Sequence, residues 1–178
     1  FVIIGVGRLN SIKKFDLLLE AFAKVHQVQS ESILIIAGDG EEKDRLIHLA
    51  KKLGVEKFVR FLGNIADVTK LYCAADVLAV TSDTESSSLV AIEAQACGTR
   101  CVLSAGVPKE SVLLQQTQKL GKNATSETWC NALLNDSYKN TAVASIEDYE
   151  VHNMSKKMKE IYLKYYSAYE EKRDVDTK

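Results

Sequence analysis

The sequence has no excess of either charge. Its 178 residues include 23 Lys and Arg against 24 Asp and Glu, which gives a formal net charge of -1 at pH 7. A nucleic-acid-binding surface or a patch for an anionic membrane would leave an excess of basic residues, so nucleic acid is not expected among the partners. Any phosphate site must therefore be built locally, from backbone amides and one or two cations.

Long apolar runs and a signal peptide are also missing. No stretch of about 18 apolar residues is available for a transmembrane helix. The first segment, Phe1 to Ile4, lacks the basic flank and the long apolar core of a signal peptide. The chain has no initiating Met and begins directly on this apolar segment. We therefore expect a piece of a longer, cytoplasmic protein.

The cysteines form neither a CxxC pair nor a Cys/His pattern of the zinc type. We interpret all four as reduced packing residues of a cytosolic protein rather than as disulfides, which are rare in that compartment. They are Cys73, Cys97, Cys101 and Cys130. No metal centre is expected from them.

Short apolar runs alternate with amphipathic stretches up to Ser104. The runs 1–4 and 33–37 are β-branched and apolar on both faces, as buried parallel strands require. Further strands are predicted at 59–63, 77–81 and 101–104, and helices at 15–26, 43–54, 66–75 and 89–96. This alternation predicts an α/β fold, a Rossmann-like doubly wound parallel sheet.

The strand pattern weakens after Ser104. Residues 126–136 are predicted to form a helix with Ser126 as its N-cap, and residues 146–172 a long helix rich in Tyr and Lys. Its tyrosines would dock on the chain's own core or on a partner domain. We therefore divide the chain into a Rossmann-like domain at 1–145 and a C-terminal helix and tail at 146–178.

Glycine and polar residues follow each predicted strand. They are GVGRLNSIKKF after the first, GDGEE after the second, Gly63 with Asn64 after the third, SDTESSS after the fourth and SAGVPKES after the fifth. In an open α/β sheet, ligands bind beyond the carboxyl ends of the strands, which meet at one edge. The sequence therefore predicts a ligand cleft at this edge.

The segment GVGRLN begins like a dinucleotide-binding fingerprint but has Asn10 where the third glycine belongs. The acidic residue of that fingerprint would be Glu20, which falls inside the first helix rather than after the second strand. A GxG pair alone is also typical of a tight turn. Arg8 and Lys13 add two cations that suit a diphosphate, the first as a bidentate fork and the second as a point charge. A solvated basic loop is the other interpretation.

The segment SDTESSSLVAIEAQACG combines a polar loop with an apolar helix. The serines before the helix, Ser86, Ser87 and Ser88, can cap it and leave backbone amides facing outwards, which is a natural anion site. In the helix, Glu93 shares a stripe with Leu89 and Ala96, and we expect that stripe to lie near the inward face.

Two glutamates flank the start of that helix. Glu85 alone could complement the helix dipole, and Glu93 alone could pair with a structural cation. Taken together, they indicate a site that binds hydroxyl groups, because carboxylates are natural acceptors for sugar O–H donors.

These segments in series resemble glycosyltransferase family 4. The resemblance rests on GRL followed by Lys13, LLLEAFAKV, LIIAGDGEE, VRFLGN, DVTKLYCAADVLAVTS and the two glutamates of an E-x7-E pattern before AQACG. It runs from Phe1 to about Glu110 and implies one half of a GT-B fold, the C-terminal donor-binding domain of a retaining enzyme. The segments IEAQACGTRCVLS and VPKE are most similar to members that build bacterial capsular, exopolysaccharide or cell-wall glycans.

The resemblance implies a role for each matching residue. Arg8 and Lys13 would neutralise the donor diphosphate and stabilise the departing nucleoside diphosphate. Glu85 would lie near the donor sugar hydroxyls, which makes these three the catalytic candidates, and Glu93 would accept hydrogen bonds from the ribose. The remaining donor-binding candidates are Ser86, Ser87, Ser88 and Leu89 at the sugar and phosphate, Gly5 and Gly7 in the cleft loop, and Leu62 and Gly63 at the nucleobase.

The resemblance to this family also implies binding partners. The donor would be a nucleotide-sugar, with UDP the commoner base, and the acceptor a glycan or lipid-linked molecule in polysaccharide biosynthesis. The family needs no metal or other cofactor. The N-terminal acceptor domain would belong to the same full-length protein and is absent from this chain, so the fragment is expected to be inactive alone. Peripheral association with the inner face of the membrane would come through that missing domain.

The chain departs from the family pattern at three places. Ser86 stands where a glycine usually follows the first glutamate, Lys14 stands where a glycine often follows Lys13, and Thr99 with Arg100 replaces a pair such as Leu-Pro. These departures leave open a nucleotide-sugar-binding domain without transferase activity. A dinucleotide-dependent oxidoreductase, and a phosphorylase or an epimerase on the same fold, are the remaining alternatives.

Overall fold

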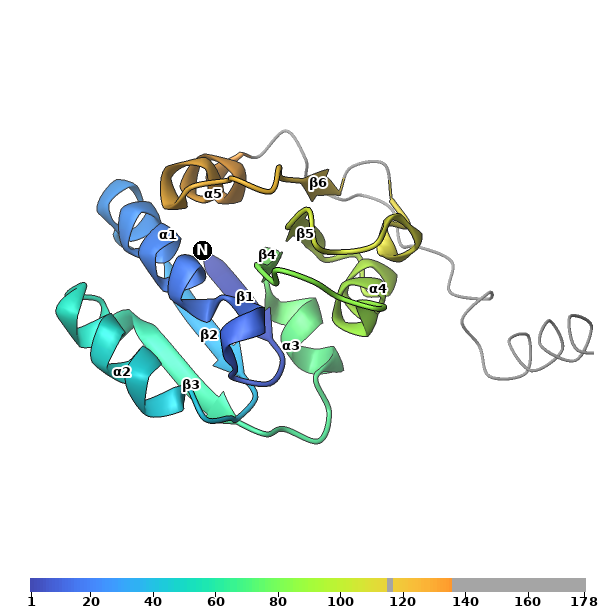
Figure 1. Ribbon diagram of the computed structural model, residues 1–178. Coiled ribbons are helices and arrows are strands. Elements are labelled where there is room, and N and C mark those ends of the chain that lie inside the picture. The colour runs from blue at the N-terminus through green and yellow to red at the C-terminus, as the bar shows by residue number, and fades with distance from the viewer. Residues whose placement is uncertain (115–116, 136–178) are drawn as a thin grey trace, which may run out of the picture. The chain divides into compact units, whose positions relative to one another are not determined.

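A computed structural model describes residues 1–114 and 117–135 (Figure 1). In this part of the chain six parallel strands form one sheet in the order β3-β2-β1-β4-β5-β6. The strands are β1 Val2–Val6, β2 Ile33–Ala37, β3 Val59–Gly63, β4 Val77–Val80, β5 Arg100–Leu103 and β6 Gln118–Lys119. The predicted α/β fold with a doubly wound parallel sheet is confirmed, and β6 is the strand that the sequence analysis missed.

Helices cover both faces of the sheet. They are α1 Phe15–Val28, α2 Lys43–Lys52, α3 Thr69–Ala74, α4 Leu89–Ala96 and α5 Ser126–Leu134, with short 3-10 turns η1 Ser11–Lys13, η2 Glu56–Phe58 and η3 Lys109–Ser111. Helices α1, α2 and α5 lie on one face, and α3 and α4 lie on the other (Figure 1). Among the described residues, no helix has the length and apolar character needed to cross a membrane.

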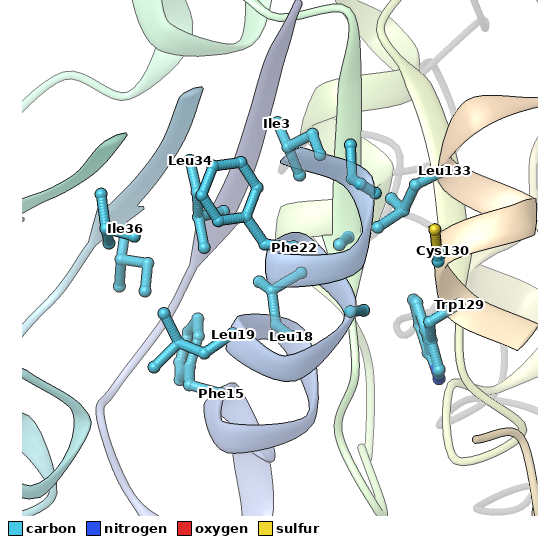
Figure 2. Packing of buried hydrophobic residues seen from close by; sticks show 14 of the residues in the cluster. Ile3, Phe15, Leu18, Leu19, Phe22, Leu34, Ile36, Trp129, Cys130 and Leu133 are labelled. Carbon is cyan, nitrogen blue, oxygen red and sulfur yellow. The ribbon is translucent and has the colours of Figure 1, made fainter. Parts of the chain in front are cut away.

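Alternate residues of each strand face the two layers, as the pleat of a strand requires. Ile3 of β1 faces α1, whereas Ile4 faces α3 and α4. Figure 2 shows Leu18 and Phe22 of α1 held between the strands and α5. The same packing includes Leu34 and Ile36 from β2 and Trp129, Cys130 and Leu133 from α5. These buried side chains fix α1, and with it the loop that precedes α1.

The strand order places a topological switch point between β1 and β4. The chain builds β1, β2 and β3 outwards in one direction and then crosses to the other side of β1 to begin β4, which pairs with β1 directly. The helices α1 and α4, which follow these two strands, lie on opposite faces of the sheet, and in open α/β sheets ligands bind at the carboxyl ends of the strands at such a point. A ligand site is expected there on topology alone.

The structure corrects several local predictions. Thr125, not Ser126, is the N-cap of α5, because its Oγ1 accepts a hydrogen bond from the backbone N–H of Thr128. Helix α3 begins only at Thr69. Of the four cysteines interpreted as packing residues, Cys73 is exposed. The helix predicted at 146–172, and with it the division of the chain at residue 145, lies outside the described residues.

Candidate functional site

The loop after β1 is held in place by a hydrogen bond within the loop and by another from the end of β4. The Oδ1 atom of Asn10 accepts a hydrogen bond from the backbone N–H of Lys13 at 3.2 Å, which starts the 3-10 turn η1. The Oγ1 atom of Thr81, directly after β4, donates to the Lys13 carbonyl at 2.7 Å. Asn10, which breaks the dinucleotide fingerprint, therefore caps the turn that positions Lys13.

Gly38 lets the loop after β2 lie directly against the loop after β1. A Cβ atom at this position would lie 1.9 Å from the carbonyl oxygen of Gly7, and the φ of Gly38 is +137°, which other residues rarely adopt. The backbone N–H of Gly7 in turn donates to the Ala37 carbonyl at 3.0 Å. A glycine at position 38 is thus needed for this close approach of two backbones.

An ion pair joins the two loops across the switch point. The Nζ atom of Lys13 lies 2.7 Å from Oε1 of Glu85, and the two side chains are only 21% and 10% exposed. Ser82 Oγ donates to the same carboxylate oxygen at 2.7 Å, and the backbone N–H of Glu85 donates to the Gly106 carbonyl at 3.0 Å. Two of the three catalytic candidates are therefore in direct contact, and Glu85 is held from its side chain and its backbone.

Arg8, the third catalytic candidate, is much more exposed to solvent than Lys13 and Glu85. Its guanidinium is 72% exposed and has a long contact of 3.4 Å with Oε2 of Glu41. Gly7, between β1 and Arg8, is also close to Lys13, since a Cβ on Gly7 would lie 3.5 Å from the Cε atom of Lys13. The two cations predicted to bind a diphosphate therefore flank one glycine, with Lys13 shielded by its ion pair and Arg8 exposed.

A pocket of about 270 Å³ opens beside Arg8 at the carboxyl ends of β1, β2 and β3. It is lined by Val6, Gly7, Arg8, Ala37, Gly38, Asn64, Ile65 and Val68. Leu62 and Gly63, predicted to meet a nucleobase, stand just before this lining, and Leu62 is an exposed apolar side chain. Asn64 and Ile65 line the pocket in their place. Gly5, another donor-binding candidate, lies within β1 and packs under Phe15 and Leu18 rather than lining the pocket.

The serines before α4 do not cap the helix with their side chains. Ser86 and Ser87 are exposed, and Ser88 occupies the N-cap position without a side-chain cap hydrogen bond. Ser88 is instead buried, its backbone N–H donates to Ser111 Oγ at 3.0 Å, and its own hydroxyl has no hydrogen-bond partner among the described residues. The prediction of a serine cap is therefore wrong. The first amides of α4, beginning at the exposed Leu89, still lack acceptors within the helix.

Glu93 lies on the outward face of α4, not near the inward one. Its residue is exposed, as is Leu89 one turn earlier, and its Oε2 atom accepts a hydrogen bond from the Tyr72 hydroxyl at 2.9 Å. The predicted inward stripe is wrong. An exposed carboxylate can bind a ligand without the desolvation cost of a buried one.

The buried polar residue of α4 is Gln95, which the sequence analysis missed. It is fully buried, and its Nε2 atom donates to the carbonyls of Ala91 and Ser111 at 2.8 and 2.9 Å. Its Oε1 atom accepts from the backbone N–H groups of Leu113 and Leu114 and from Thr117 Oγ1. The i, i+3, i+4 spacing of Ala91, Ala94 and Gln95 was the available signal. Gln95 fixes the segment that follows β5.

A second pocket, of about 380 Å³, lies at the carboxyl ends of β4 and β5. Asp83 and Ser104 come from these two ends, and Lys122 and Trp129 come from later in the chain. No sequence pattern predicted that Lys122 and Trp129 contribute to this edge. Among residues 1–114 and 117–135, no three His, Cys, Asp or Glu side chains are grouped to hold a metal ion, and the expectation of a metal-free site stays a prediction.

Comparison with known proteins identifies one family. The model of the family "Glycosyl transferases group 1" matches residues 1–141. The D-inositol 3-phosphate glycosyltransferase of Mycobacterium sp. (strain KMS) is 41% identical over 115 residues, which is 60% of this chain and 26% of that protein. The N-acetyl-alpha-D-glucosaminyl L-malate synthase of Bacillus anthracis is 33% identical over 101 residues, 57% of this chain and 26% of that protein. The chain thus spans about a quarter of the length of these curated relatives.

A solved structure is similar in fold and in sequence. The crystal structure of Anabaena Alr3699/HepE in complex with UDP-glucose matches with a TM-score of 0.69 and 27% identity, over 79% of this chain and 40% of that one.

Proposed function

We propose that this chain, which belongs to the glycosyl transferases group 1 family, is the donor-binding half of a retaining GT-B glycosyltransferase that uses a UDP-sugar. The observation that carries the proposal is the Lys13–Glu85 pair at the switch point, with Arg8 beside it. The similarity to a protein crystallised with UDP-glucose supports the choice of donor.

In the proposed reaction, the bond between the anomeric carbon of the sugar and the β-phosphate oxygen breaks. The acceptor hydroxyl oxygen forms the new bond on the same face of the sugar, and its proton passes to the departing diphosphate. Negative charge builds on that diphosphate, where the Arg8 fork and the Lys13 ammonium would stabilise it. The amides at the start of α4 would add partial positive charge. With these groups present, we expect no metal to be required.

The two glutamates have separate proposed roles. Glu85 would accept hydrogen bonds from the donor sugar hydroxyls, and Ser82 and Lys13 fix its Oε1 atom and leave Oε2 for the sugar. Lys13 would then be shared between Glu85 and a phosphate oxygen. Glu93, exposed on α4, would accept hydrogen bonds from the ribose hydroxyls. The nucleobase would occupy the pocket beside Arg8 that Asn64 and Ile65 line.

The acceptor is proposed to be a glycan or lipid-linked molecule in polysaccharide biosynthesis, bound by an N-terminal domain of the same protein at the cytoplasmic side of the membrane. The IEAQACGTRCVLS and VPKE segments support this proposal. A small hydroxylated acceptor is the second candidate, because the two sequence relatives carry names of enzymes that act on inositol 3-phosphate and form a malate conjugate. Activity assays of the full-length protein with both acceptor classes separate them.

Nucleotide binding to the 178-residue chain tests the donor site directly. In a calorimetric screen of UDP, GDP and their sugars, UDP and a UDP-sugar should bind, and Arg8→Ala should weaken UDP binding about tenfold through the loss of charge-assisted hydrogen bonds. Arg45→Ala is the matched control, since Arg45 is an exposed arginine of α2 that pairs with Asp16 and Glu42. The proposal fails if no nucleotide binds, or if both variants bind as the unaltered chain does. Robust transfer by this chain alone would contradict its role as a donor-binding half.

A further inference from the structure

The proposed ribose ligand, Glu93, has a partner on the neighbouring helix. Helices α3 and α4 pack side by side on one face of the sheet (Figure 1). Tyr72 of α3 donates its hydroxyl hydrogen to Oε2 of Glu93 at 2.9 Å. Glu93 is exposed, so water competes for it on every other side. An exposed glutamate without such a contact would sample several rotamers.

Tyr72 is held rigidly. Its residue is 1% exposed, and it packs in one core cluster with Ile4, Leu78, Ala91, Ala94 and Cys101. Thr99 Oγ1 donates to the Tyr72 carbonyl at 2.8 Å, which ties the backbone of α3 to the segment after α4. The ring therefore lies in the core, and its hydroxyl reaches the carboxylate of the exposed Glu93.

The Tyr72 hydroxyl stays a donor. Burial, and then the hydrogen bond with Glu93, raise its pKa well above the ordinary value for tyrosine. Its proton is therefore present over the whole range in which nucleotides are tested. With Oε2 occupied by this proton, Oε1 of Glu93 is the oxygen that points to other donors.

We propose that Tyr72 is a positioning residue for Glu93, and that the two form a ribose-reading dyad in which Tyr72 fixes the carboxylate so that its free oxygen meets the ribose hydroxyls. This inference rests on the proposed function of Glu93. The dyad makes the site selective for ribonucleotides, because a ligand without these hydroxyls gains nothing from the fixed carboxylate. Tyr72 itself touches no ligand in this arrangement.

The test compares UDP with 2′,3′-dideoxy-UDP on the 178-residue chain. The ratio of their dissociation constants measures the contribution of the ribose hydroxyls. The unaltered chain should prefer UDP by about tenfold or more, since hydrogen bonds to a charged group are lost in the dideoxy ligand. Glu93→Gln should bring the ratio close to one. Tyr72→Phe should lower the ratio about fivefold, because the carboxylate must then be immobilised during binding, and should leave binding of the dideoxy ligand unchanged.

Thr117→Val is the matched control. It removes a buried hydroxyl that donates at 2.9 Å to Gln95 on the same helix but on the inward side. It should lower the midpoint of urea unfolding as Tyr72→Phe does, and leave the ligand ratio unchanged.

Three outcomes overturn the inference, and they separate it from the proposed function. If Glu93→Gln abolishes the preference for UDP and Tyr72→Phe keeps it, Glu93 reads the ribose without Tyr72. If Thr117→Val lowers the ratio as much as Tyr72→Phe, the effect is general destabilisation. If Glu93→Gln keeps the full preference, the ribose role of Glu93 fails and the dyad fails with it.

Discussion

The loop after β1 carries two cations whose ion pairs differ in almost every physical respect. Lys13 meets Glu85 at 2.7 Å from across the switch point, and both side chains are largely shielded from water. Arg8 meets Glu41 at 3.4 Å, and both side chains are mostly exposed. Exposed pairs contribute little and exchange readily, whereas shielded pairs are costly to break. Lys13–Glu85 is therefore part of the site's architecture, and Arg8–Glu41 is a contact that an incoming phosphate can replace.

The largest expected loss of stability comes from disturbing the close backbone contact between Gly38 and Gly7, next to Arg8 and Lys13. Gly38→Ala places a Cβ against the Gly7 carbonyl, which must move and take Arg8 and Lys13 with it. We expect a loss of at least about 3 kcal/mol in the free energy of unfolding, from overpacking and backbone strain together. Gly54→Ala is the control, because Gly54 has a φ of +74° but no atom within 4 Å of the added Cβ. It should cost about 1 kcal/mol, and equal losses in the two variants would show that Gly38 is not a special contact.

Breaking the shielded pair is expected to cost less than Gly38→Ala and more than breaking an exposed one. Lys13→Met leaves the carboxylate of Glu85 without its cation, and we expect urea unfolding to give a loss of about 2 kcal/mol, below the value for a fully buried pair. Lys14→Met makes the same substitution one residue along, where the lysine has a 3.6 Å contact with the exposed Asp83. That variant should lose about 0.5 kcal/mol or less. The contrast between the two pairs disappears if both variants lose the same amount.

Removing the ion-pair partner of Arg8 is expected to have the smallest effect of these substitutions. It should strengthen UDP binding, whereas Arg8→Ala should weaken it. Glu41→Gln removes the carboxylate that competes with a phosphate for the guanidinium, so UDP affinity by calorimetry should rise about twofold, with a stability change of about 0.5 kcal/mol or less. Glu42→Gln, at the next residue, is the control, because Glu42 pairs with Arg45 instead. A fall in UDP affinity for Glu41→Gln would mean that Glu41 helps to place Arg8 for the ligand.

The sequence predicted the sheet closely and the site only in part. Strands β2 and β3 were predicted with the bounds that the structure has. Strand β2 is a continuous apolar run with β-branched residues on both faces, whereas the edge strand β3 alternates exposed with less exposed residues. The two-residue strand β6 has no such pattern. The Lys13–Glu85 contact joins residues 72 positions apart, and only the order of strands in the sheet brings them together.

The failures on α4 have a common physical cause. This helix is short and apolar on most of its surface, so its sequence favours no single inward face. Glu93 was placed inward with Leu89, but small residues at Ala91 and Ala94 pack closely enough to bury that side instead. The serines were expected to cap the helix, and the segment after β5 supplies Ser111 as the partner of Ser88. Contacts from segments distant in sequence therefore determined both the outward face of Glu93 and the missing serine cap.

The most direct test of the account is where UDP binds. Backbone amide NMR shifts of the 178-residue chain should be followed during a UDP titration. We expect the largest shifts in the loop from Gly7 to Lys13 and at Leu89, the two sides of the switch point. Shifts confined to the second pocket, around Lys122 and Trp129, or no shifts at all, would contradict a donor site built on Lys13, Glu85 and Arg8.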